Sequence, residues 1–364
     1  MHGTKPLGYL GDEFLDRVRR SYRLALNIHG QDGDKGPVWQ PIEERRKDVH
    51  AALVSSDNGE LRRIFADPVS TDLYYGTDGI CRSIFGRLQN DCEYREGFAV
   101  HVRGLIKDVA KAMGLPEAGD PDFSIGRMDD LLLQRVEFPS PFDGEIGLET
   151  ARGLATERSV RALYEIFRVL KLLGSNKPRR IVEIGPGVGR TALYGYRAGL
   201  DYTTVDLPLG MVAQACFLGA VLGPDRLWFE GENDIPPNDR IKILAGLPNR
   251  LFDVAVNADS MTEMPLGVAI DYVIGFKRNV PVFMSINHSK NLFTVAEIFA
   301  ITRAGHLRKR QPCAMWPGYS EDVYDMTPAD SLLMPVRVRA FRGYIGARAK
   351  LRQASRWLVA KRNT

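Results

Sequence analysis

The sequence of 364 residues has few cysteines and no long apolar run. Its four cysteines, Cys81, Cys92, Cys216 and Cys313, show no metal-ligand spacing, so free thiols in a reducing compartment are expected. No stretch approaches the roughly 18 consecutive apolar residues of a membrane span. Residues 1–5 lack the apolar core of a signal peptide. With 44% apolar and 26% charged residues, the sequence predicts an ordinary cytoplasmic globular protein.

Acidic residues are absent from the segment 331–364, which carries nine lysines or arginines. Without those nine, the formal charge of +4 becomes −5, so no nucleic-acid partner is expected for the rest of the chain. Arg348, Arg352 and Arg356 recur at i, i+4 spacing within a helical pattern, where like charges cost about 0.2–0.5 kcal/mol per pair. A peripheral membrane surface or an acidic partner would offset that repulsion. A solvated helix face packed on the body is the alternative.

The most informative stretch is a short apolar run followed by three glycines at alternate positions. The run is Ile181–Ile184, the glycines are Gly185, Gly187 and Gly189, and a helix-compatible segment, Thr191–Ala198, comes next. This order predicts a buried strand, a tight turn and a helix start, the first unit of a doubly wound, Rossmann-like α/β sheet. Glycines permit a positive φ and the close approach of a ligand.

Two residues of this turn disfavour a phosphate ligand. The Glu183 carboxylate would repel phosphate, and Pro186 has no N–H to donate. The Gly-Lys-Ser/Thr ending of a phosphate-binding loop is also missing. A carboxylate beside a glycine-lined pocket instead favours a cationic ligand such as S-adenosylmethionine, which carries an ammonium and a sulfonium. A mere strand-to-helix connection is the alternative.

A second predicted strand, Leu200–Asp206, ends in a carboxylate 17 residues after Gly189. An acid at that strand tip is placed to accept both ribose hydroxyls of an adenosyl group, with Leu207 beside it. Asp206 could equally cap the helix that follows, and both roles can hold together. The glycines and Glu183 upstream lead us to favour the ligand role.

The pattern of elements divides the chain into three parts. We expect a helical N-terminal region, 1–148, for substrate binding or homodimerisation, a cofactor domain, 149–341, and a basic helical tail, 342–364. The segment 114–148 is rich in Pro, Gly and Asp and is expected to form loops at the boundary. The expected helices are 12–28, 43–54, 59–66, 96–113 and 157–173, and the expected strands are 181–184, 200–206, 226–230, 241–244, 252–257, 280–286 and a late pair within 301–341.

Polar residues follow the last two parallel strands of this prediction. Asp259 and Glu263 come after the strand 252–257, and Asn287 and His288 come after the strand 280–286. The tips of parallel strands face one crevice, which is where acid–base groups and substrate contacts are expected. A helical turn would place Asp259 and Glu263 on one face.

A later loop combines aromatic and acidic residues. Trp316 and Tyr319 could stack on a sugar, and Glu321 could accept its hydroxyl hydrogens. A lid turn with buried aromatic rings explains the loop equally well.

Together these residues resemble class I S-adenosylmethionine-dependent methyltransferases and, more narrowly, bacterial sugar O-methyltransferases of polysaccharide and glycoconjugate clusters. The resemblance covers roughly residues 39–340. It is carried by Val182–Gly189, Val205–Pro208, Asn257–Met264, Ser285–Asn287 and Gly318–Glu321, with Asp67–Ser70, Tyr75–Gly76 and Arg152–Gly153 upstream. It implies S-adenosylmethionine as the cofactor, Asn257 and Arg152 among its binding residues, and a small-molecule or glycan hydroxyl as the acceptor. His288 has no counterpart in the pattern.

Methyl transfer to a hydroxyl needs alignment and a base that removes the hydroxyl proton. His288, Asp259 and Glu263 are the candidates, and the titration range of histidine favours His288, with a structural histidine as the alternative. We therefore expect His288→Ala to keep cofactor affinity and lose most turnover. The same three residues could ligate Mg²⁺ or Mn²⁺, although we favour metal-free catalysis.

Two rival interpretations of the sequence remain. A nicotinamide-dependent oxidoreductase would have the third glycine one residue later and no acid before the first. A non-catalytic binding protein with the methyltransferase fold would keep the ligand site and transfer no methyl group.

Overall fold

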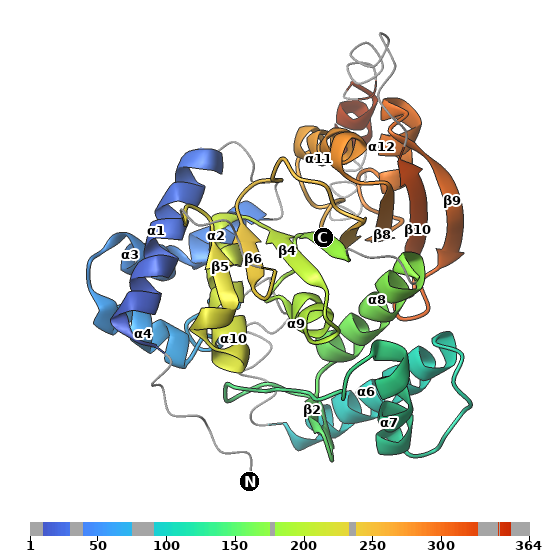
Figure 1. Ribbon diagram of the computed structural model, residues 1–364, viewed down its shortest axis with the longest axis horizontal. Coiled ribbons are helices and arrows are strands. Elements are labelled where there is room, and N and C mark those ends of the chain that lie inside the picture. Colours follow the sequence, from blue (N-terminus) through green and yellow to red (C-terminus); the bar gives the residue numbers. More distant parts are fainter. Residues whose placement is uncertain are drawn as a thin grey trace, which may run out of the picture.

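The computed structural model describes residues 10–29, 39–74, 91–174, 179–232, 238–326, 341 and 343–350. An eight-stranded sheet with the order β5-β6-β4-β3-β7-β8-β10-β9 forms its centre (Figure 1). The strands are β3 (Arg180–Ile184), β4 (Asp201–Val205), β5 (Leu227–Phe229), β6 (Ile241–Leu244), β7 (Val254–Ala258), β8 (Val282–His288), β9 (Gly305–Pro312) and β10 (Tyr319–Met326). The pairs from β5 to β8 are parallel, and β10 is antiparallel to both neighbours. The predicted doubly wound α/β sheet is confirmed.

Helices cover both faces of the sheet. The covering helices are α8 (Glu157–Leu173), α9 (Arg190–Arg197), α10 (Pro208–Leu222), α11 (Leu266–Asn279) and α12 (Val295–Thr302). Successive strand residues point to opposite faces. Ile181 of β3 accordingly packs in the apolar cluster that contains α8, α9 and α10 residues, while Val182 packs with α11 and α12.

The chain reverses its direction across the sheet between β3 and β7. From β3 it runs outward through β4 to the edge strand β5 and to β6, and it then returns to β7 on the other side of β3. In open α/β sheets, ligands bind at the carboxyl ends of the strands beside such a switch point. The fold therefore places the expected ligand site at the tips of β3, β4 and β7.

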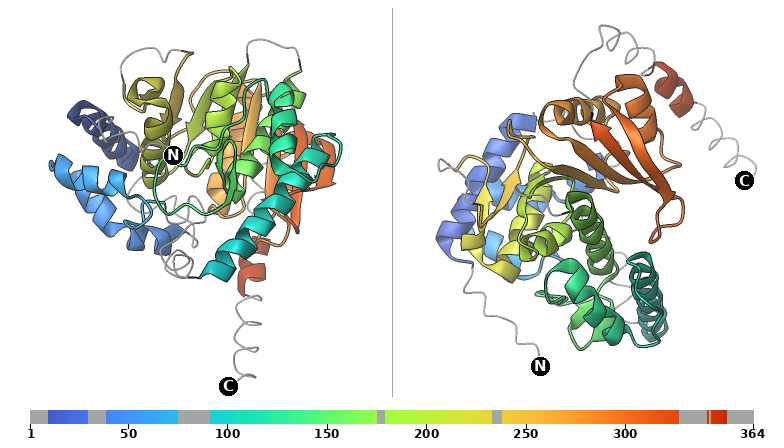
Figure 2. Two further views of the ribbon diagram at one scale, coloured as in Figure 1. Left: turned by 90° about the horizontal axis from the view of Figure 1, so that it is seen from below. Right: turned by 45° about the vertical axis from the view of Figure 1, so that its right-hand side comes forward.

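The N-terminal region is helical, as predicted. Its elements are α1 (Asp12–His29), α2 (Trp39–Arg45), α3 (Lys47–Val54), α4 (Asn58–Ala66), α6 (Cys92–Ala112), α7 (Pro121–Leu132) and the hairpin β1 (Leu148–Thr150) and β2 (Gly153–Ala155). Figures 1 and 2 show α1 to α4 beside the β5 edge and α6 and α7 beside α8. Phe14 and Leu15 of α1 belong to the same apolar cluster as β5 and α10. The domain boundary at 148 stays a prediction.

The prediction of loops throughout 114–148 is wrong for residues 121–132, which form helix α7. The Asp120 side chain accepts a hydrogen bond from the backbone N–H of Asp122, and Pro121 occupies the first turn. Both are helix-start signals. They override a composition that is otherwise typical of loops.

Residues 343–350 of the basic tail are helical, and Arg348 is paired with Glu297 of α12 at 3.2 Å. Arg352 and Arg356 lie outside the described residues. Within the part of the chain that the structure describes, no helix is long and apolar enough to cross a bilayer.

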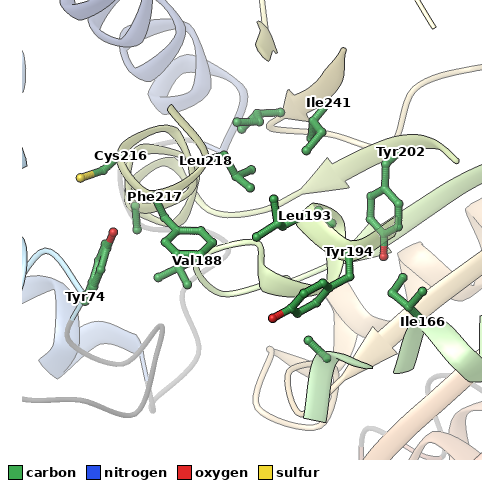
Figure 3. Packing of buried hydrophobic residues seen from close by; sticks show 14 of the residues in the cluster. Tyr74, Ile166, Val188, Leu193, Tyr194, Tyr202, Cys216, Phe217, Leu218 and Ile241 are labelled. Atoms are coloured by element: carbon green, nitrogen blue, oxygen red, sulfur yellow. The ribbon is translucent and has the colours of Figure 1, made fainter. Parts of the chain in front are cut away.

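Two glycines within helices allow a matched test of packing. A Cβ on Gly195 of α9 would overlap the ring of Tyr202, which Figure 3 shows within the buried apolar cluster, whereas a Cβ on Gly104 of α6 meets nothing within 4 Å. We expect Gly195→Ala to lower the free energy of unfolding by about 1–3 kcal/mol through overpacking. Gly104→Ala should raise it by about 0.5–1 kcal/mol, because alanine loses less conformational entropy in a helix.

Denaturant unfolding of both variants measures the difference. Equal shifts for Gly195→Ala and Gly104→Ala would show that Tyr202 moves freely. Tyr202 would then not be a fixed partner for the groups around it.

Candidate functional site

A cavity lies at the carboxyl ends of β3, β4 and β7, at the switch point of the sheet. Its empty volume is about 1130 Å³ including the open mouth. The wall combines the glycine turn, the tips of β4 and β7, one face of α8 and the ends of two N-terminal helices. Its polar lining includes His29, Trp39, Arg158, Glu165, Glu183, Asp206, Asp259 and Glu263.

The glycine turn forms one side of the cavity. Gly185, Gly187 and Gly189 have φ values of 66°, 63° and 89°, a region that other residues rarely adopt. A Cβ on Gly185 would also overlap the Ser260 hydroxyl. Gly185 and Gly187, with Pro186, thus let the backbone itself line the cavity.

Glu183 lies at the end of β3 with a side chain that is 2% exposed. It accepts a hydrogen bond from the Tyr202 hydroxyl at 3.0 Å. Burial raises its pKa well above the ordinary value, and the nearby Glu165 carboxylate raises it further. The acid that the sequence places beside the glycines therefore faces the cavity, as expected.

Asp206 lies both beside the start of α10 and on the cavity wall. Its carboxylate accepts hydrogen bonds from the Leu207 backbone N–H at 2.8 Å and from the Gln214 side chain at 2.9 Å, at the start of α10. It also lines the cavity together with Leu207. A Cβ on Gly210 would lie 2.5 Å from the Asp206 carboxyl carbon, so α10 needs a glycine there. Burial raises the pKa of Asp206 to about 7.

A buried arginine from the N-terminal region faces this carboxylate. Arg46, between α2 and α3, is 1% exposed, and burial lowers its pKa to about 10. Asp206 is the foremost charge that opposes this lowering. The guanidinium in turn lowers the pKa of Asp206, although less than burial raises it. The N-terminal helices thus complete the site on the sheet.

The tip of β7 carries a second group of polar residues. Asp259, with a φ of 56°, accepts a hydrogen bond from the Tyr319 hydroxyl at 2.6 Å and pairs with Arg158 at 3.7 Å. Burial and the neighbouring Asp259 raise the pKa of Glu263 to about 7. A tight turn, with the Glu263 N–H bonded to the Ser260 carbonyl, replaces the helical turn expected between the two acids. Both carboxylates still line the cavity.

Two aromatic residues close this end of the cavity. Trp316 lines the wall, and the Arg161 guanidinium lies 3.8 Å from its ring centroid. Trp39 of α2 reaches Glu263, whose pKa it lowers through a side-chain hydrogen bond. Trp316 was predicted from the sequence as a site residue, whereas Trp39 was not.

Asn257 and Asn287 do not line the cavity. The Asn257 amide nitrogen donates to the Ile184 carbonyl and the Ser260 hydroxyl, and its oxygen accepts from the Met261 N–H and from Asn287. These bonds hold the tips of β3, β7 and β8 together. Both asparagines therefore position the strand tips beside the cavity, and Asn287 also lines a smaller hollow.

Arg152 and Glu321 also lie elsewhere. Arg152 is paired with Asp129 at 2.9 Å and donates to the Val136 carbonyl, beside the β1–β2 hairpin. Glu321 is buried on β10, where Tyr164 and Arg168 of α8 bind its two oxygens at 2.5 and 2.7 Å. Both charges are satisfied by the protein, so neither serves the cavity.

The position of His288 contradicts its predicted roles as the base and as a metal ligand beside Asp259 and Glu263. It lines a separate, smaller hollow with Arg310 and Asp322, and its ring contacts Tyr319 edge-on at 5.0 Å. Asp259 and Glu263 therefore share a cavity that His288 does not reach. No cluster of three His, Cys, Asp or Glu residues suited to a metal ion occurs in the described residues.

Comparisons with known proteins return structural matches alone. No protein-family model matches the chain, and no curated protein matches it. The chain is similar to an rRNA methylase from Escherichia coli (14% identity, TM-score 0.32, 79% of this chain and 100% of that chain). It is also similar to the CcbJ methyltransferase from Streptomyces caelestis (13%, 0.33, 47% and 89%) and to the mitomycin 7-O-methyltransferase MmcR (11%, 0.33, 86% and 94%). The choice of ligand therefore rests on the cavity.

Proposed function

We propose that the chain is an S-adenosylmethionine-dependent methyltransferase. The observation that carries the proposal is the buried carboxylate of Glu183 beside a turn of three glycines at the switch point. Among the described residues, Glu183 forms no ion pair with a lysine or arginine. A buried carboxylate is stable when a cation or a proton compensates it. An ammonium-bearing ligand supplies that charge, and a pyrophosphate would repel the carboxylate.

The donor would lie with its ribose at Asp206 and its amino-acid end toward Glu183. When bound, S-adenosylmethionine supplies a methyl group on a positively charged sulfur. The Asp206 carboxylate, ionised beside Arg46, accepts hydrogen bonds from the ribose hydroxyls. The glycine turn leaves room for the ligand to approach the backbone.

The acceptor would be a hydroxyl of a small polar molecule, a sugar or glycan being the class that the lining supports. Glu263, with a pKa near the working pH, is suited to remove the hydroxyl proton. Asp259, held by Tyr319 and Arg158, is suited to orient a neighbouring hydroxyl. Trp316 also lines the cavity, with its ring stacked against Arg161 and Tyr319. Glu263 thus replaces His288 as the proposed base.

Calorimetric titration with S-adenosylhomocysteine and, separately, with NADH tests the donor. We expect S-adenosylhomocysteine to bind and NADH not to bind. The reverse result would overturn the proposal in favour of an oxidoreductase. A second assay follows S-adenosylhomocysteine release from S-adenosylmethionine over a panel of hydroxylated small molecules. Binding without release for every acceptor would instead favour the non-catalytic binding protein.

A further inference from the structure

A second buried acid, Glu165, lies on the cavity wall and has no part in the function described above. Glu165 lies on α8, the helix before β3, and its side chain is 5% exposed. Its Oε2 accepts a hydrogen bond from the Thr191 hydroxyl at 2.5 Å. In the part of the chain that the structure describes, Oε1 has no hydrogen-bond donor. The Glu165 carboxylate is thus held by Thr191 through one oxygen and lines the cavity.

Thr191 connects Glu165 to Glu183. Thr191 is the second residue of α9, directly after the glycine turn, and its hydroxyl also interacts with Glu183. A hydroxyl has one hydrogen to donate, and that hydrogen goes to Glu165. Burial and the Glu165 carboxylate raise the pKa of Glu183, and the Thr191 hydroxyl lowers it less than they raise it. This arrangement is favourable when the pair of acids shares a proton, since two adjacent buried carboxylates repel each other.

The charges around the pair leave it short of a cation. Arg158, Arg161 and Asp259 face Glu165, and Asp206 faces Glu183. Arg158 is paired with Asp259, and Arg161 is paired with Glu157. The neutral Tyr202 and Cys313 also lie near the two acids. Neither carboxylate of the pair has an arginine within ion-pair distance among the described residues.

We propose that Glu165 and Glu183 act together as a clamp for the ammonium group of the ligand, and that the clamp holds a proton which this group displaces. The proposal rests on the proposed function, because it assigns the amino-acid end of the donor to this pair. Glu165 is then a binding residue from outside the glycine motif. The ligand class is a nucleoside that carries a primary ammonium.

The balance of charge gives the clamp its selectivity. The ammonium group takes the place of the proton between the two acids, and the proton leaves to solvent, so the charge inside the clamp stays constant. The carboxylate of the amino-acid end lies outside the clamp. A nucleoside without an amino group cannot displace the proton. Burial raises the pKa of Glu165 to about 7, which places this exchange near neutral pH.

Calorimetry in buffers of different ionisation enthalpy counts the protons released on binding. At neutral pH, wild-type protein should release protons when it binds S-adenosylhomocysteine and none when it binds 5′-methylthioadenosine, which has no amino-acid end. Glu165→Gln keeps the size of the side chain and its contact with Thr191. This variant should release fewer protons and bind S-adenosylhomocysteine about tenfold more weakly, in line with the loss of a charged hydrogen bond. Glu149→Gln, at an exposed position on β1, is the matched control and should behave as wild type.

A second measurement needs no ligand. The folded state of an acid with a raised pKa binds a proton that the unfolded state has already lost, so stability falls as pH rises between the two pKa values. For Glu165 this window runs from the ordinary 4.5 to about 7. The free energy of unfolding should therefore fall across that window more steeply for wild type than for Glu165→Gln.

Three results separate the outcomes. Absence of S-adenosylhomocysteine binding to wild-type protein would overturn the proposed function itself. Binding by wild type, with the same affinity and proton release in Glu165→Gln, would overturn the clamp alone. Unchanged binding of 5′-methylthioadenosine by the variant, beside weaker binding of S-adenosylhomocysteine, shows that the fold is intact and supports the clamp.

Discussion

Replacing Glu263 with glutamine is expected to lower the methyl-transfer rate by about 10²–10⁴-fold, the usual contribution of a general base. Glutamine has the same size but cannot take a proton. Wild-type kcat should rise with pH as Glu263 ionises, because burial and the neighbouring Asp259 raise its pKa to about 7. That rise should disappear in Glu263→Gln. The measurement is the rate of S-adenosylhomocysteine release between pH 5.5 and 8.5, with the acceptor that wild type uses fastest.

His288→Ala is the matched control for this experiment. His288 lies at the tip of the neighbouring strand β8 but lines a different hollow, so its loss should leave the rate and its pH dependence unchanged. Affinity for S-adenosylhomocysteine should be unchanged in both variants. If His288→Ala lowered the methyl-transfer rate and Glu263→Gln left it unchanged, His288 would be the base and Glu263 would not.

The sequence predicted His288 as the favoured base, whereas the cavity favours Glu263. This difference has a physical cause. The sequence predicted which strands end in polar residues, because apolar runs with polar ends are visible in one dimension. Which cavity a strand-end side chain reaches depends on how the neighbouring strands and loops pack around it. At the tip of β8, His288 and Asn287 both line the smaller hollow, and Asn287 also donates a hydrogen bond to Asn257 of β7. The sequence has no signal for that packing.

The donor side of the cavity was more predictable. Its signals lie within one βα unit and the next strand along the chain. They are the glycines that need a positive φ, the acid before them and the acid at the tip of the next strand. Glu183, the glycine turn and Asp206 accordingly meet at one cavity. The spatial order of the edge strands was not predictable, since β6 follows β5 in the chain yet lies between β4 and β5 in the sheet.

Residues contributed by distant segments were missed for a different reason. Trp39 of α2 and Arg46, between α2 and α3, reach the site only through tertiary packing. Glu165 did leave a trace in the sequence. It is a glutamate on the apolar face of a strongly amphipathic helix, between Ala162 and Ile166, where a charged residue is costly unless it has a function or a partner.

The largest expected effect on donor binding comes from Asp206. Asp206→Asn keeps an oxygen for the Leu207 N–H but removes the charge that faces Arg46 and the cavity. We expect the Kd of S-adenosylhomocysteine to rise at least about tenfold, since hydrogen bonds to a charged group contribute about 1.5–3 kcal/mol. Because burial raises the pKa of Asp206 to about 7, wild-type affinity should also weaken as pH falls below neutral. In Asp206→Asn, the contribution of this residue to the pH dependence should be lost.

Calorimetry between pH 5.5 and 8.5 measures both effects, with Asp225→Asn at an exposed position as the control. The Asp206 effect can be separated from that of the Glu165–Glu183 pair by the choice of ligand. 5′-Methylthioadenosine has the ribose but no ammonium, so Asp206→Asn should weaken its binding while Glu165→Gln should not. Wild-type affinity of a folded Asp206→Asn variant for this nucleoside would remove Asp206 from the ribose site. The carboxylate would then serve only the start of α10, where it already binds the Leu207 N–H and Gln214.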